Sequence, residues 1–365
     1  MTLIKAAVCH AFSEPLRIET VNLRAPLAGE VEVTLDACAI CFSDISYMDG
    51  GWGGALPAVY GHEAAGRISA IGPSVGGYAK DDPVLVTLIR SCGTCPTCAA
   101  GRPVLCAAPP GQGSPLTTSA GNPVEQGLGC GAFAKKVVVA ASQIAPIPAG
   151  IPMATAALMS CGVITGLGAA VNTARIRPGE VVVVIGAGGV GLNAIQGARL
   201  AGAGRIIAVD MKPEKLDIAR EFGATDGLLG SIAKPWAEAK RIAGRGADAV
   251  LVTVGAIDAY DTANRYLANG GRMVAVGMPH SGAKSAWEPV IFTYTGNAMI
   301  GSNMGDTVLA RDIPWISDLY LQGRLKLDEL ISGRWSLDQI NAAIADTRSG
   351  AARRNVIIFN PEPVS

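Results

Sequence analysis

The sequence predicts an α/β protein of two domains, in which a β-rich part is combined with a doubly wound parallel sheet. Its 365 residues exceed the ~250–300 residues that one hydrophobic core usually serves. Short segments of alternating apolar and polar residues fill the first third of the chain. After Pro178 and Gly179, mostly apolar runs alternate with helical segments. This change of pattern predicts the second domain.

The first third predicts short β-strands separated by Gly and Pro: 30–37, 64–71 and 84–89. In the first of them Val31, Val33 and Leu35 fall on one face, which is the period-two pattern of a half-buried strand. The segment 107–131 is rich in Gly, Pro, Ser and Thr and has no periodicity. It predicts a long loop near a functional site, because structureless loops of that length are uncommon without one.

The second half predicts four further strands: 180–185, 205–209, 247–254 and 272–276. The run 180–185 is β-branched after its first residue, as expected of a strand buried on both faces. One helix is expected up to Ala201, and another begins at Pro213 and ends at Gly223. This alternation indicates a parallel doubly wound sheet. Beyond Trp315 the tail mixes helical and strand signals.

Composition and charge favour a soluble globular enzyme. Hydrophobic residues make up 49% of the chain, and 30 Lys and Arg balance 30 Asp and Glu. This neutrality argues against a protein that binds nucleic acid or a membrane surface electrostatically. No apolar run approaches the ~20 uninterrupted residues that a transmembrane helix needs, and the start of the chain has no signal-peptide pattern. The chain is therefore expected to be cytoplasmic, where its nine cysteines need another explanation than disulfides.

A glycine-rich motif, Gly186-Ala-Gly188-Gly189-Val190-Gly191, satisfies GxGxxG. It follows a predicted strand and opens a helix, and Asp210 lies nineteen residues beyond Gly191. That context predicts a dinucleotide site in which the glycines let the backbone approach the pyrophosphate. Asp210 favours NAD over NADP, because it accepts hydrogen bonds from the ribose and repels a 2′-phosphate. Lys215 can approach the same ribose, although a solvated helix lysine explains it equally well.

Four cysteines lie within the short segment 92–106: Cys92, Cys95, Cys98 and Cys106. Four thiolates suit a closed tetrahedral zinc whose task is structural, because no coordination position is left open. A DNA-binding zinc module is the alternative, but only Arg90 and Arg102 are basic nearby.

A second candidate metal site is dispersed along the chain. His62 is one of only three histidines, and Cys41 and Cys161 complete a possible Cys2His set. Three protein ligands and one open position are the arrangement of a catalytic zinc. Taken alone, a single histidine is more often structural.

These motifs, in this order, resemble the zinc-containing medium-chain alcohol dehydrogenase family over essentially the whole chain. The resemblance rests on five segments: Cys41-x-Ser43-Asp44, Gly61-His62-Glu63, the four-cysteine lobe, Cys161-Gly-x-x-Thr165-Gly, and Gly186–Gly191 with Asp210. It implies a GroES-like β-rich catalytic domain at 1–162 and 304–365, interrupted by a Rossmann NAD-binding domain at 163–303. It also implies one catalytic and one structural zinc per chain, and a homodimer or homotetramer. The branch that oxidises formaldehyde–thiol adducts is the most similar, from the glycine-rich stretch after Cys106 and from 301–305.

The resemblance assigns roles at the reacting centre. Cys41, His62 and Cys161 bind the catalytic zinc, and Glu63 is an alternative ligand beside it. Asp44 orients His62.

Further roles concern the substrate and the coenzyme. Ser43 lies next to the substrate oxygen and takes its proton. Thr165 and Val190 flank the nicotinamide, and Arg354 lies near the coenzyme phosphates. Three residues line the substrate pocket, with ordinary core packing as the alternative: Trp52, Leu88 and Met278.

Two residues depart from the family pattern. Phe42 stands where many relatives carry Arg or His against the pyrophosphate, which weakens coenzyme binding. Ser46 stands where relatives often carry the histidine that passes the proton to solvent, so the proton exit route differs. Three further cysteines are expected to be buried as small hydrophobic residues: Cys9, Cys38 and Cys130.

The expected activity is reversible hydride transfer between NAD and a primary alcohol or aldehyde, or an S-hydroxymethyl thiol adduct, with zinc as Lewis acid. Two alternatives stay open. One is a zinc-independent medium-chain reductase of quinones or enoyl compounds. The other is a non-catalytic NAD-binding Rossmann protein.

Overall fold

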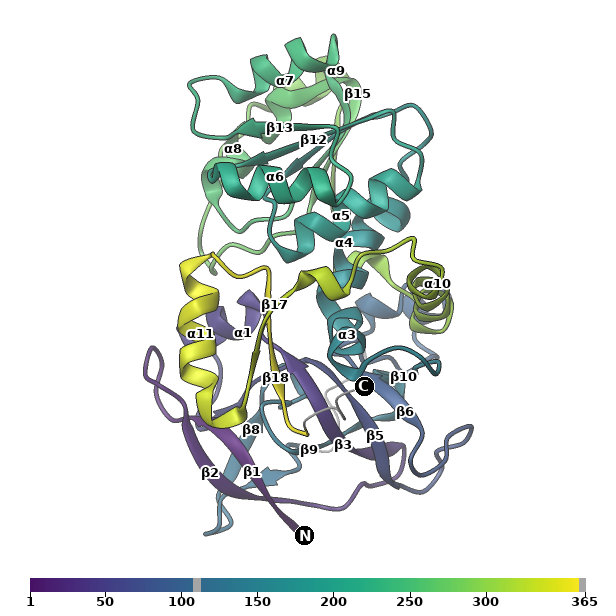
Figure 1. Cartoon of the computed structure of the whole chain (residues 1–365), viewed down its shortest axis with the longest axis vertical. Helices are drawn as coiled ribbons and strands as arrows, with labels where there is room; N and C mark the ends of the chain where they lie inside the picture. The colour runs from purple at the N-terminus through teal and green to yellow at the C-terminus, as the bar shows by residue number, and fades with distance from the viewer. Residues whose placement is uncertain (108–112, 361–365) are drawn as a thin grey trace. The chain divides into compact units, whose positions relative to one another are not determined.

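The computed structural model describes residues 1–107 and 113–360, which form two compact units (Figure 1). The first unit comprises 1–161 and 308–365, and the second comprises 162–307. The domain boundaries expected from sequence, after 162 and after 303, lie one and four residues from these. The first unit is thus made of two stretches that are distant in sequence.

Two β-structures make up the first unit. The first is a closed barrel in the order β1-β2-β7-β8-β4. Its strands are β1 (Thr2–Cys9), β2 (Arg17–Leu23), β7 (Leu116–Thr117), β8 (Pro123–Gln126) and β4 (Ala58–Val59). The second is a sheet in the order β10-β6-β5-β3-β18-β17, with β9 paired to β3. Its strands are β10 (Ile144–Pro146), β6 (Pro83–Val86), β5 (Glu63–Ile71), β3 (Glu30–Ala39), β18 (Arg354–Ile358), β17 (Ile331–Trp335) and β9 (Lys136–Ala140).

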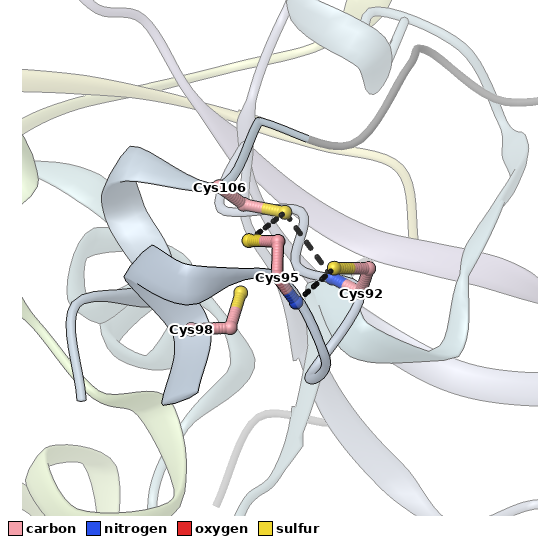
Figure 2. A group of neighbouring side chains, drawn as sticks. All are labelled: Cys92, Cys95, Cys98 and Cys106. Carbon is pink, nitrogen blue, oxygen red and sulfur yellow. Dashed lines mark hydrogen bonds between the residues drawn. The ribbon is translucent and has the colours of Figure 1, made fainter. Parts of the chain in front are cut away.

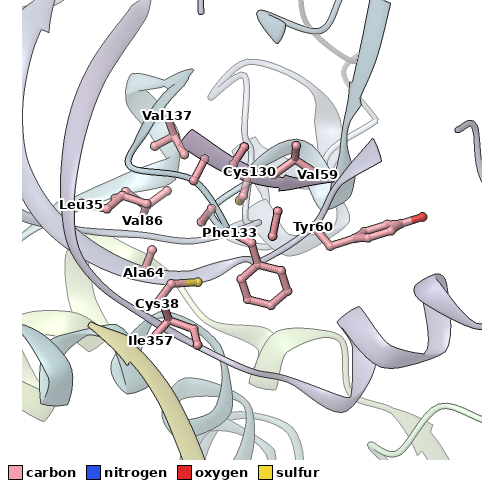
Figure 3. Close-up of a cluster of buried hydrophobic side chains, with 14 of the residues drawn as sticks. Leu35, Cys38, Val59, Tyr60, Ala64, Val86, Cys130, Phe133, Val137 and Ile357 are labelled. Carbon is pink, nitrogen blue, oxygen red and sulfur yellow. The ribbon is translucent and has the colours of Figure 1, made fainter. Parts of the chain in front are cut away.

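One hydrophobic core packs between these strands (Figure 3). Leu35 and Phe133 are both 0% exposed within it. Cys9, Cys38 and Cys130 are also 0% exposed, which confirms that they are buried as small hydrophobic residues.

The single long loop expected at 107–131 is wrong in part, because short elements interrupt it. Residues 108–112 of that segment lie outside the described residues, but the rest contains β7, β8 and a 3-10 turn at Gly127–Gly129. β7 pairs with β2 and β8 with β4, so both strands belong to the barrel. Strands of two and four residues are too short to show a period-two pattern, and their pairing partners decide their structure.

Short helices complete the first unit. The α-helices are α1 (Phe42–Met48), α2 (Pro96–Ala99), α3 (Met153–Leu158), α10 (Leu309–Leu321) and α11 (Ile340–Ser349). The 3-10 helices are η1 (Pro103–Leu105), η2 (Gly127–Gly129), η3 (Ala141–Gln143), η8 (Asp328–Leu330) and η9 (Leu337–Gln339).

The second unit is a six-stranded parallel sheet in the order β13-β12-β11-β14-β15-β16. Its strands are β11 (Val181–Ile185), β12 (Arg205–Asp210), β13 (Asp226–Leu229), β14 (Ala247–Val252), β15 (Leu267–Ala275) and β16 (Ala298–Gly301). Its helices are α4 (Ile164–Gly168), α5 (Gly189–Leu200), α6 (Pro213–Glu221), α7 (Pro235–Ala243), α8 (Ile257–Ala263), α9 (Pro289–Thr295), η6 (Asn264–Tyr266) and η7 (Met304–Asp306). The strand order reverses beside β11, as in a dinucleotide-binding fold. The predicted doubly wound sheet is therefore confirmed.

One helical run, Met153–Thr173, is long and apolar enough to cross a membrane by length and composition. The sequence expectation concerned uninterrupted apolar residues, and polar residues such as Ser160 and Asn172 interrupt this run. In the fold, 94% of the apolar window of this run is buried inside the protein, as expected of a core helix. The run is not regular, because two π-helical segments interrupt it, η4 (Met159–Val163) and η5 (Ala169–Thr173).

Candidate active site and metal centres

Four buried side chains converge in the first unit: Cys41, His62, Glu63 and Cys161. Their ligand atoms all lie within 4.8 Å of one another. Cys41 is the N-cap residue of α1, directly after β3, and Glu63 begins β5. Cys161 lies in the π segment η4. The fold thus brings together the residues that the sequence suggested as one metal site.

Asp44 holds the imidazole of His62 in one orientation. The Nδ1 atom of His62 lies 2.9 Å from Oδ1 of Asp44, and a carboxylate oxygen can only accept, so Nδ1–H donates. Oδ1 also accepts the N–H of Gly61 at 2.9 Å, and Oδ2 accepts the N–H of Cys41 at 3.1 Å. In the neutral imidazole Nε2 then keeps its lone pair, and this atom is buried without a hydrogen-bond partner among the described residues. A bound metal ion would satisfy that nitrogen.

Gly61 makes the turn before His62 possible. Its φ is +92°, and a Cβ there would lie 2.6 Å from the backbone nitrogen of Phe133. Only glycine combines that φ with so close an approach of two backbones. The sequence Gly61-His62 therefore places the imidazole where Asp44 can hold it.

Glu63 and Arg354 form a buried pair beside these ligands. The Nη2 atom of Arg354 lies 3.6 Å from Oε1 of Glu63, and the two side chains are 7% and 0% exposed. Burial raises the pKa of Glu63 to about 7, although Arg354 opposes the shift. Neither carboxylate oxygen has a hydrogen-bond partner among the described residues. Sequence reasoning missed this pairing, because residues 291 positions apart show no spacing signal.

The two cysteines of this group share a hydrogen bond. The hydrogen bond from Cys161 lowers the pKa of Cys41 well below its usual value, and His62 lowers this pKa further. Burial opposes the shift, but its effect is smaller. The thiolate is the form of cysteine that binds metals. The donor set of one imidazole and two sulfurs fits zinc.

The second group of four donors is the cysteine lobe (Figure 2). The sulfurs of Cys92, Cys95, Cys98 and Cys106 all lie within 4.8 Å of one another. Backbone N–H groups of Cys92 and Cys95 donate to the sulfurs of Cys106 and Cys92, each at 3.3 Å. A hydrogen bond between Cys95 and the Thr97 hydroxyl lowers the pKa of Cys95 to about 5, and the Cys98 N–H adds to the lowering.

The lobe has almost no core of its own. No residue of α2 or η1, the two helical pieces inside it, is buried. A segment without apolar burial needs another source of folding free energy, and a structural zinc supplies it directly. The four-sulfur set fits that role.

The glycine-rich loop opens α5 in the second unit. Gly186 has φ +99°, and a Cβ there would lie 2.4 Å from Val254 Cγ1. A Cβ on Gly191 would lie 1.8 Å from the Gly186 carbonyl oxygen. At Gly188, the N-cap of α5, a Cβ would meet no atom within 4 Å. Packing thus requires glycine at positions 186 and 191. Gly188 instead leaves room beside the N-terminus of a helix, where a pyrophosphate binds.

Asp210 ends β12 and supports this loop. Its Oδ2 accepts the N–H of Ala187 at 2.8 Å, and its Oδ1 accepts the N–H of Lys212 at 3.1 Å. Each oxygen keeps a lone pair for a further donor, such as a ribose hydroxyl. The support of the loop was not expected from the sequence. Lys215 lies on α6 and is partly buried.

The other predicted coenzyme residues lie close together in the second unit. Thr165 on α4 is 9% exposed. At its neighbour Gly166, a Cβ would lie 2.3 Å from the carbonyl oxygen of Val190, so α4 and α5 pack closely here. Arg354 belongs to the first unit and contacts Glu63; its predicted place beside the coenzyme phosphates stays a prediction.

Ser43 is partly buried on the first turn of α1, two residues after Cys41. Trp52 contacts Tyr47 edge to face, with ring centroids 5.0 Å apart, and Tyr47 stacks on Tyr60 at 6.1 Å. This aromatic cluster was not expected from the sequence, because its members share no period.

Leu88 is partly buried against the core of the first unit, which supports ordinary packing there. Met278 is 62% exposed in the second unit, so core packing does not explain it.

Two family models match the chain: Alcohol dehydrogenase GroES-like domain at residues 27–149, and Zinc-binding dehydrogenase at 189–321. The NDMA-dependent alcohol dehydrogenase of Amycolatopsis methanolica is 32% identical, with 98% of this chain and 99% of the relative covered. A probable S-(hydroxymethyl)glutathione dehydrogenase of Schizosaccharomyces pombe is 33% identical, with 98% and 97% covered.

The fold agrees with a solved structure, that of benzyl alcohol dehydrogenase from Acinetobacter calcoaceticus. The TM-score is 0.93 at 29% identity, with 99% of this chain and 100% of the other covered. Sequence and fold therefore lead to one conclusion: the chain belongs to the zinc-binding, GroES-like alcohol dehydrogenase family of oxidoreductases.

Proposed function

We propose that the protein is a zinc-dependent dehydrogenase that transfers a hydride reversibly between NAD and a primary alcohol or its aldehyde, including S-hydroxymethyl thiol adducts. The buried group of Cys41, His62 and Cys161 carries this proposal, with the Nε2 atom of His62 left to coordinate a metal. Three protein donors leave one coordination position for substrate. Zinc bound there supplies a Lewis acid for the substrate oxygen.

Other residues of the chain orient the metal ligand, accept the substrate proton and hold the coenzyme. Asp44 keeps His62 in the tautomer that binds metal. Ser43, on the same helix turn as Asp44, takes the proton from the substrate hydroxyl. The Gly186–Gly191 loop and Asp210 hold the coenzyme. The second zinc, in the cysteine lobe, has a folding role.

Steady-state rates on a small substrate panel test the proposal. The panel comprises a linear primary alcohol, benzyl alcohol, and formaldehyde with glutathione, each with NAD. Turnover of at least one member that stops when the metal is removed supports the proposal. Turnover of a quinone or enoyl substrate that survives metal removal favours a zinc-independent reductase instead. NAD binding without turnover on any member favours a non-catalytic Rossmann protein.

We expect the coenzyme preference to depend on Asp210. Replacing Asp210 with Ser removes the charge that a 2′-phosphate must face, while the serine hydroxyl can still accept one loop N–H. The use of NADP, measured as kcat/KM, should rise about tenfold or more, or ~1.4 kcal/mol. Asp217→Ser, on the exposed side of α6, is the control and should not change the preference. A native enzyme that prefers NADP would contradict the assignment.

We also expect the proton path to run through Ser43 and then a coenzyme ribose hydroxyl to water. Ser43→Ala should slow alcohol oxidation by ~10²–10⁴-fold, as for other positioned acid–base groups. Ser46 lies three residues further along α1, and residues so spaced share a helix face. Ser46→His should raise the rate near neutral pH and add a pH dependence near ~6.5. The pH–rate profiles are compared with a deuterated alcohol, whose isotope effect shows that hydride transfer limits the rate. An unchanged profile in Ser46→His would remove that position from the path.

We further infer that the protein is a cytoplasmic homo-oligomer. None of the nine cysteines forms a disulfide, as expected in a reducing compartment. β16 is an edge strand, and α9 has no buried residue, with Val290 67% and Tyr294 87% exposed. The exposed apolar side chains of α9 and the unpaired edge of β16 are features that a second copy of the chain can cover. Sedimentation should show a dimer or tetramer, and a monomer would contradict the inference.

A further inference from the structure

Cys161 lies where the helical run changes its hydrogen-bond pattern. α3 ends at Leu158, η4 continues as a π-helix over Met159–Val163, and α4 resumes at Ile164. A π turn contains one more residue than an α turn, so it rotates the residues after the turn by about 100° relative to a regular helix. The direction of the Cys161 side chain therefore depends on the π turn, and π turns often occur at functional sites.

Ser160, the residue before Cys161, has a hydrogen bond that suits this irregular turn. Its side chain is 0% exposed, and its Oγ donates to the carbonyl oxygen of Ala157 at 2.6 Å. The carbonyl oxygen of Ala157 also accepts a backbone N–H, so the hydroxyl is a second donor that competes with the helical hydrogen bond, and side-chain donors of this kind bend or shift helices.

Other helical hydroxyls in the chain show which part of this contact is specific. Thr262 and Thr347 lie in regular α-helices and donate to the carbonyl four residues back. Ser349, at the end of α11, donates to the carbonyl three residues back, as Ser160 does. Ser317, in α10, is also 0% exposed, but its hydroxyl has no partner among the described residues. Among these hydroxyls, that of Ser160 is the one that donates at the start of a π segment.

We propose that Ser160 is a positioning residue for the catalytic metal. Its hydrogen bond to Ala157 stabilises the π turn, and the π turn directs the sulfur of Cys161 toward Cys41 and His62. This inference rests on the proposed function, because it concerns the metal that these three side chains would hold. It predicts that a residue which never touches the metal sets the geometry of one ligand.

The test is cadmium-113 NMR of the full-length protein with both sites loaded. The two sites differ in the number of sulfur donors, so each should give its own resonance. Ser160→Ala removes one oxygen atom and should leave the fold intact. We expect it to move the resonance of the Cys2His site alone and to weaken metal binding there by ~10–100-fold in competition with a chelator, the range for other outer contacts of metal ligands.

Two controls separate positioning from a general loss of stability. Ser317→Ala removes a buried helical hydroxyl elsewhere in the same unit. Thr155→Val removes the hydrogen bond from Thr155 to Asp328 in α3, the helix that leads into the π turn. Both variants should leave both resonances and both affinities unchanged.

Three results would overturn the inference. Unchanged resonances and affinities in Ser160→Ala would show that the hydroxyl does not position Cys161. An equal change in Thr155→Val would show that any loosening of the helix has the same effect. A native protein with no Cys2His resonance at all would overturn the proposed function as well.

Discussion

Replacing His62 with Ala should leave a folded protein whose turnover has fallen by about 10³-fold or more. The imidazole is one of three protein donors to the proposed catalytic metal, and a Lewis acid at that position stabilises the transition state by several kcal/mol, at ~1.4 kcal/mol per factor of ten. The fold should survive, because Asp44 keeps two backbone N–H donors from Gly61 and Cys41. The measurements are kcat, KM and metal content on one alcohol.

His10→Ala is the matched control for this variant. His10 pairs with Glu19 at the surface, with its side chain 35% exposed, and has no part in the site. Asp44→Asn gives an intermediate case, because it preserves shape but loses the charge that orients His62; a loss of ~10–100-fold is expected. Full turnover of His62→Ala on the same alcohol would show that the buried donor group is not the reacting centre.

Cys95→Ala should lose one zinc per chain and much of the thermal stability, while turnover at low temperature falls far less than in His62→Ala. Structural zinc contributes its binding free energy to folding, and α2 and η1 have no buried residue to compensate. A loss of only a few kcal/mol in the free energy of unfolding lowers Tm by about 10 °C in a protein of this size class. Calorimetry and zinc analysis of the same sample give both quantities.

Ala99→Ser is the control within the lobe, because Ala99 is exposed on α2 and carries no metal donor. It should keep two zinc ions and the native Tm. If Cys95→Ala also kept two zinc ions and the native Tm, the four sulfurs would not form a metal site, despite their mutual distances of at most 4.8 Å.

The metal-ligand residues could be identified from sequence because rare residue types marked them. Three histidines in the chain made His62 conspicuous, and four cysteines on one short segment have few explanations in a protein without disulfides. The parallel sheet was also predictable, since β11, β12 and β14 are mostly apolar segments between helices. These features are local, so a single segment shows them.

The features that could not be predicted depend on tertiary contacts. β7 and β8 are strands only because β2 and β4 pair with them. The contact between Glu63 and Arg354 joins two strands from opposite ends of the chain. The π turn lies inside 153–173, where nearly every residue is buried, so no apolar period marks the change of helix type. The support that Asp210 gives to the glycine loop required coordinates.

The proposed function requires that one of two zinc ions makes this protein an NAD-linked dehydrogenase. It is tested most directly by measuring zinc content and NAD reduction on the same purified sample, during stepwise chelation and then on return of zinc. We expect two zinc ions per chain, one for each group of four donors. Turnover should fall in proportion to the loss of one of them and return with it. A zinc-free protein that oxidises alcohols at the full rate would contradict the account.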